Sequence, residues 1–89
     1  MEKVFIVFKL HCDDGCVSDF TTLPFLDKQK AIDEVRSAYA SDLEDCAEKW
    51  ESDDYYKEVD LDNGFFTIYK KGEFTNDGYE VKIQEHEVK

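Results

Sequence analysis

The residues best suited to chemistry lie together near the N-terminus, in the run His11-Cys12-Asp13-Asp14-Gly15-Cys16. Two thiols three residues apart, preceded by an imidazole, fall within the ligand spacing of zinc sites, and the tip of a β-hairpin suits such a site. Tetrahedral zinc needs further ligands, however. Cys46 falls on the apolar side of a predicted helix, and His86 is remote in the sequence. We therefore expect no bound metal and no cofactor.

The cysteines could instead form a disulfide, since Cys12 and Cys16 flank the predicted turn. Three cysteines are an odd number for a secreted disulfide scaffold. The apolar residues 4–10 are interrupted by Lys9 and lack the small-residue cleavage site of a signal peptide. No run approaches the roughly 20 apolar residues of a membrane helix. We predict a cytoplasmic protein with free thiols.

Motifs of catalysis are missing from the sequence. It contains no Gly-rich phosphate loop, no G-x-S-x-G and no H-E-x-x-H. The adjacent acids Asp13 and Asp14 do not have the alternate spacing that a calcium loop requires. A chain of 89 residues also has difficulty forming a pocket that buries a substrate. We predict a protein that is not an enzyme.

The most charged segment is residues 42–62, where ten acidic side chains accompany two lysines. It holds most of the net charge of −11, and such a patch serves either solubility or the docking of a cationic partner. Much of it lies in the C-terminal half of the predicted helix, where the macrodipole prefers cations. Glu44 and Glu48 form a like-charged i,i+4 pair, which Asp45 and Lys49 offset in part. Stability alone would not select this arrangement.

We predict a protein-binding patch that combines these acids with the two tyrosines that follow them. Its members are Asp42, Glu44, Asp45, Glu48, Glu51, Asp53, Asp54, Tyr55 and Tyr56. A tyrosine beside acids suits an interface anchor, and burial of the tyrosines is the alternative. The predicted function is a small acidic interaction module that docks a basic protein, with nucleic-acid mimicry as a specific form. The alternative is a metal- or thiol-dependent protein centred on His11, Cys12 and Cys16.

Composition limits the partners further. The strong negative charge repels DNA, RNA and anionic membranes, so we expect direct binding to neither nucleic acid nor membrane. With 42% hydrophobic and 15% aromatic residues, the chain is too apolar for a disordered acidic tail. The length predicts one domain, residues 1–89. The sequence leaves the oligomeric state open between monomer and homodimer.

Hydrophobic patterning predicts the elements that position these residues. Residues 4–10 read as a central strand, residues 13–15 as a turn with a three-residue loop, and residues 16–22 as a more polar strand. Asp27 is the predicted N-cap of a long amphipathic helix over residues 28–51. Its apolar arc comprises Ile32, Val35, Tyr39, Ala40, Leu43, Cys46, Ala47 and Trp50.

The C-terminal third predicts two further strands, at residues 65–71 and 79–88, separated by a polar loop at 72–78. A turn precedes the first of them at residues 62–64, and an additional strand at 56–61 is left open. The predicted fold is therefore α+β and of ββαββ type. One long amphipathic helix packs on a mainly antiparallel sheet of four strands.

Overall fold

A computed structural model describes residues 2–72 and 77–88, so the predicted polar loop at 72–78 lies largely outside the described residues. The elements are β1 (Glu2–Asp13), β2 (Cys16–Phe25), α1 (Lys28–Asp45), α2 (Ala47–Glu51), β3 (Tyr55–Asp60), the 3-10 helix η1 (Leu61–Asn63), β4 (Phe65–Lys70) and β5 (Asp77–Val88). No helix in this described part is long and apolar enough to cross a membrane.

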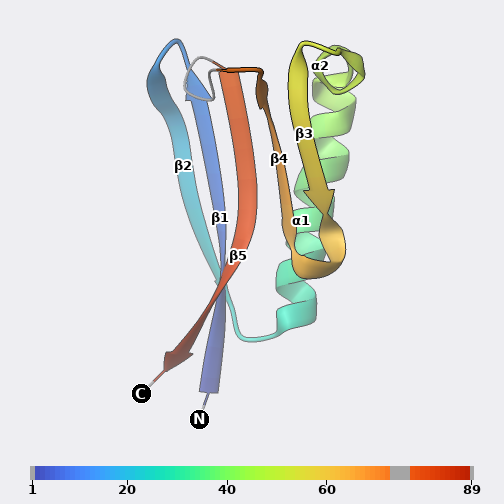
Figure 1. The fold of residues 1–89 in the computed structure, drawn as a ribbon. Helices are drawn as coiled ribbons and strands as arrows, with labels where there is room; N and C mark the ends of the chain where they lie inside the picture. The colour runs from blue at the N-terminus through green and yellow to red at the C-terminus, as the bar shows by residue number, and fades with distance from the viewer. Residues whose placement is uncertain (1, 73–76, 89) are drawn as a thin grey trace.

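The described strands form one antiparallel sheet in the order β2-β1-β5-β4-β3 (Figure 1). The predicted α+β class is confirmed, but the count of four strands is wrong, because β3 adds a fifth. Its sequence, Tyr-Tyr-Lys-Glu-Val-Asp, is half charged, which obscured its character as a strand. β3 lies at the edge of the sheet, where one side of the strand needs no partner and charged residues are tolerated.

The β1–β2 hairpin closes through a loop of two residues rather than the predicted three. Asp13 pairs with Cys16, and the intervening Asp14 and Gly15 have φ values of 52° and 83°. Positive φ at both central positions is the geometry that Asp-Gly favours, and its twist matches that of the flanking strands. The hairpin thereby fixes which residues of β1 and β2 share a face.

The helical segment begins as predicted and ends differently. Asp27 caps α1, its carboxylate accepting a hydrogen bond from the Gln29 N–H at 2.8 Å. Instead of running unbroken to residue 51, the helix stops at Asp45, and Cys46 (φ −126°, ψ 37°) separates it from α2. The last turn of α1 carries acids and no basic residue. Continuation is disfavoured there, since acids oppose the helix dipole.

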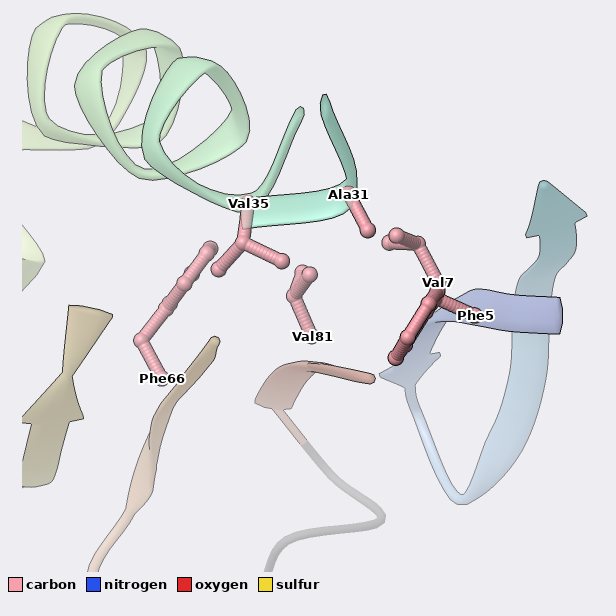
Figure 2. Packing of buried hydrophobic residues seen from close by; sticks show 6 residues of the cluster. All are labelled: Phe5, Val7, Ala31, Val35, Phe66 and Val81. Atoms are coloured by element: carbon pink, nitrogen blue, oxygen red, sulfur yellow. The ribbon is translucent and has the colours of Figure 1, made fainter. Parts of the chain in front are cut away.

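The core lies between α1 and one face of the sheet (Figure 2). Its buried members are Phe5, Val7, Ala31, Val35, Phe66 and Val81. Most of the predicted helical phase is confirmed: Ile32 and Val35 are buried, while Tyr39 and Trp50 pack against the core.

The limits of the predicted arc need correction. Leu43 and Cys46 are only half-buried, and Ala40 and Ala47 are exposed. Ala31 and Ala38 pack on the core instead. The apolar stripe is therefore rotated slightly toward the side of α1 that carries Ala31 and Ala38, and the break at Cys46 ends its regular spacing.

Candidate protein-binding face and groove

An open groove of about 410 Å³ lies between the C-terminal half of α1 and strands β1, β2 and β5. Strand pairing explains one of its walls. His11 of β1 pairs with Asp19 of β2 on one side and Tyr79 of β5 on the other, so the three side chains form a row on the helix-facing side of the sheet. Lys9 lies one step further along β1 on the same side.

The helical wall of the groove is acidic. Glu34, Asp42 and Asp45 of α1 line it, together with the hydroxyls of Ser37 and Ser41. With Asp19 opposite, four carboxylates therefore line one groove.

Part of this negative charge is neutralised within the chain. Lys9 Nζ lies 2.7 Å from Glu34 Oε1, with both side chains largely covered. The Asp42 carboxylate accepts a hydrogen bond from Trp50 Nε1 at 2.7 Å, and the neutral indole brings no compensating charge. Asp19, Asp42 and Asp45 thus remain as the net negative charge of the groove.

Two uncharged groups in the groove, the Tyr79 hydroxyl and the Cys46 thiol, have raised pKa values. Burial raises the pKa of the Tyr79 hydroxyl to about 12, and the charges of Asp42, Asp19 and Glu34 add to the rise. Burial also raises the pKa of the Cys46 thiol, again helped by Asp42. Both groups stay protonated near neutral pH, because burial and the neighbouring carboxylates both disfavour a further negative charge. The Cys46 thiol is therefore a poor nucleophile.

A second polar cluster fixes α2 to the sheet beside the groove. Asp77 accepts hydrogen bonds from Lys49 Nζ, at 2.8 Å, and from the Tyr55 hydroxyl. Burial alone would raise the pKa of Asp77, but these two hydrogen bonds hold it below its ordinary value. Burial likewise would lower the pKa of Lys49, yet its hydrogen bond to Asp77 raises it. The sequence pattern had paired Lys49 with Asp45 instead.

The predicted patch is divided by the structure. Asp42 and Asp45 line the groove. The other acids of the patch are exposed on α1, α2 and the following turn, outside the groove lining: Glu44, Glu48, Glu51, Asp53 and Asp54.

The two tyrosines of the patch point to opposite faces of the sheet, as neighbours in a strand must. Tyr55 is half-buried and held by Asp77. Tyr56 packs on Tyr69 with ring centroids 5.0 Å apart, on the side away from the helices. Tyr56 therefore lies on the opposite face of the sheet from the groove, and Tyr55 is already engaged within the chain.

The residues of the alternative metal or thiol site do not converge. His11 Nδ1 lies 3.0 Å from Ser18 Oγ, and the imidazole meets Tyr79 edge-on. Cys12 is buried, Cys16 is exposed, and all three cysteines are free. Among residues 2–72 and 77–88, no three His, Cys, Asp or Glu side chains are arranged to hold a metal ion.

Sequence reasoning missed Asp19, Glu34 and Tyr79 as members of the site. They come from β2, α1 and β5, and no local pattern joins them. Comparisons of the chain with protein-family models, curated proteins and solved structures find no match. The groove is therefore interpreted from its own geometry.

Proposed function

We propose that this protein is a non-enzymatic interaction module that binds a basic protein, with the groove receiving a lysine or arginine side chain of that partner. The observation that carries the proposal is the convergence of Asp19, Asp42 and Asp45 on a hollow of about 410 Å³. The pKa of Tyr79 is raised first by burial and then by the charges of Asp42, Asp19 and Glu34, and this second contribution supports the proposal because it reflects negative charge where a cationic group would enter.

Besides negative charge, the groove has aromatic rings and hydroxyl groups that a cationic side chain would contact. The rings of Tyr79 and His11, which meet edge to face, line its sheet wall. A guanidinium is attracted to an aromatic face as well as to carboxylates, so arginine would gain from both walls. The serine hydroxyls of α1 supply additional acceptors. These features favour one inserted cationic side chain over diffuse attraction.

The exposed acids outside the groove have a different role in this proposal. Glu44, Glu48 and Glu51 extend the negative field over α1 and α2 and steer a cationic partner toward the groove. Nucleic-acid mimicry is the less favoured form, because it needs a regular row of carboxylates along one helix. The break at Cys46 interrupts such a row.

The test is capture of a partner from lysate of the native host at low and high salt. We expect the double variant Asp19→Asn/Asp45→Asn to retain its fold and to lose capture at least about tenfold. The matched control is Asp33→Asn/Glu87→Gln, which removes the same charge at two exposed positions away from the groove. Unchanged capture by the groove variant, with the wild-type salt sensitivity, would refute the proposal.

A direct measurement complements the capture experiment. An arginine-rich peptide added to the purified protein should shift the NMR signals of Tyr79 and His11 more than a lysine-rich peptide of equal length. Equal shifts spread over all exposed acids would show that charge alone attracts cations and that the groove receives no side chain.

A further inference from the structure

The face of the sheet opposite the helices is covered by no described element (Figure 1). Alternation along the strands places many apolar side chains there. They are Ile6, Phe8, Leu10, Phe20, Phe65, Tyr69 and Tyr56. Phe20 is 56% exposed, although its ring packs against Phe8 with centroids 6.1 Å apart. We call this surface the open sheet face.

Most of the open sheet face carries little net charge in a protein of net charge −11. Over β2, β1, β5 and β4, along residues 4–10, 20–24, 65–69 and 78–84, its only charged side chains are Glu80 and Lys82, two residues apart on the central strand β5. The edge strand β3 adds Glu58 and Asp60, which lie on the same side as Tyr56. Neither Glu80 nor Lys82 forms an ion pair with another described residue. The acidic groove lies on the other side of the sheet.

We propose that two copies of this chain associate face to face through their open sheet faces. Elsewhere, two copies meet with strong like charge, whereas the part of this face formed by β2, β1, β5 and β4 combines one charge of each sign with apolar surface. A twofold interface places the same patch on both sides, so residues exchange partners reciprocally. Antiparallel alignment of the two β5 strands sets Lys82 of one copy opposite Glu80 of the other, and the reverse. The Glu80–Lys82 pair is thus self-complementary. The same alignment brings Glu58 and Asp60 of the two β3 strands near each other at the exposed rim, where water and salt screen their repulsion.

The shape of the open sheet face also suits a second copy of the chain. A hollow of about 250 Å³ lies between Phe8, Leu10 and Phe20 on one side and Glu80, Lys82 and Gln84 on the other. Its apolar wall offers contact area for a side chain of the facing copy, while the charged wall holds the reciprocal pair. Packing of two sheets at about 10 Å brings such side chains into contact.

The available area is sufficient for a stable dimer. Five strands about 4.8 Å apart and six to twelve residues long, at about 3.3 Å per residue, give roughly 500–900 Å² of face per copy. A standard protein interface buries about 800 Å² per partner. The open sheet face is therefore of the right size, and most of it is apolar.

The test is sedimentation equilibrium of the purified protein over a wide concentration range. We expect a reversible dimer, and Phe20→Asp should raise its dissociation constant at least about tenfold. The control is Leu26→Asp, because Leu26 is 75% exposed but lies in the connection between β2 and α1, off the face. Circular dichroism confirms that each variant is folded.

A charge exchange tests the orientation of the two copies. Lys82→Glu and Glu80→Lys should each weaken the dimer, and the double variant Lys82→Glu/Glu80→Lys should restore it. A wild-type protein that stays monomeric at all concentrations would refute the proposal and leave the face to a different partner. A dimer that resists Phe20→Asp would place the interface elsewhere and refute it equally. Loss of partner capture in groove variants would affect neither result.

Discussion

At the scale of single residues, the pKa of Tyr79 depends on its burial and on the carboxylates of the groove. Burial and the nearby carboxylates raise its pKa to about 12, above the ordinary value of about 10. The folded protein therefore binds more protons than the unfolded chain between these values. Its contribution to stability is complete below pH about 10 and is lost as the pH rises through about 12.

We expect Asp19→Asn to lower the pKa of Tyr79, because it removes one of the charges that oppose ionisation. The measurement is a tyrosinate absorbance titration, with the Tyr79→Phe titration subtracted to isolate this residue. Asp33→Asn, on the exposed side of α1, should leave the midpoint unchanged. An equal midpoint in Asp19→Asn and the wild type would mean that burial alone sets the shift.

Asp77 makes the stability of the fold depend on pH in the acid range, and this dependence is opposite in sign to that of Tyr79. Burial would raise its pKa, but hydrogen bonds from Lys49 and Tyr55 hold it below the ordinary value. The stability that it provides is present above pH about 4 and is lost as the pH falls through the lower folded-state pKa.

We predict that Asp77→Asn lowers the free energy of unfolding by about 1–2 kcal/mol near neutral pH, since it weakens two charge-assisted hydrogen bonds. Urea unfolding measured from pH 7 downward checks this, and the difference from wild type should shrink in acid. Asp62→Asn is the control. Asp62 is 91% exposed and pairs with Arg36, so its loss should cost less than about 1 kcal/mol.

At the scale of elements, the sequence carried much of the fold. The Asp27 cap, the Asp-Gly turn of the first hairpin and the apolar stripe of α1 are local signals, and each reappears in the structure. β3 was uncertain because half of its residues are charged. The break at Cys46 was missed, because its causes include the accumulated acids of the last turn rather than a proline or glycine.

The difference between the predicted and observed core leads to a stability prediction. Phe66 is fully buried and contacts the rings of Tyr39, Trp50 and Tyr79, whereas Leu43 is only half-buried and lies outside the core cluster. Phe66→Ala should cost about 3–5 kcal/mol. Leu43→Ala should cost roughly 1 kcal/mol, although it belongs to the predicted apolar arc. Denaturant unfolding of both variants compares them directly, and equal costs would show that Leu43 packs more deeply than described.

The candidate site was less accessible to sequence reasoning than the fold. Asp42 and Asp45 were identified from local charge, but Asp19, Glu34 and Tyr79 join them only through strand register and the position of α1 over the sheet. The positions of Tyr55 and Tyr56 likewise depend on strand register and could not be predicted from local sequence. Once residues 55–60 are known to be a strand, Tyr55 and Tyr56 must face opposite sides, but the sequence pattern alone does not define that strand.

At the scale of the whole molecule, the two faces of the sheet differ in chemistry. The helix side carries the acidic groove, and the open sheet face is mainly apolar, with its excess acids confined to the edge strand β3. A partner bound in the groove and a second copy on the open face would not compete for the same surface. A dimer would then present two acidic grooves on its outer sides, which favours a partner with two basic segments.

This division of charge predicts opposite salt dependences for the two proposed associations. Between about 0.01 M and 1 M salt, the Debye length falls from about 30 Å to about 3 Å. Attraction between the acidic groove and a basic partner should weaken over this range, since its long-range part is screened. Self-association should strengthen, because screening removes the repulsion between two copies that each carry −11. Salt series of peptide binding and of sedimentation equilibrium measure the two effects separately.

The variant Glu44→Lys/Glu48→Lys, which lowers the net negative charge without touching the open sheet face, should dimerise more tightly at low salt and respond less to added salt. Weakening of the dimer by salt would mean that ionic contacts hold the two copies together and that apolar contact does not dominate the interface.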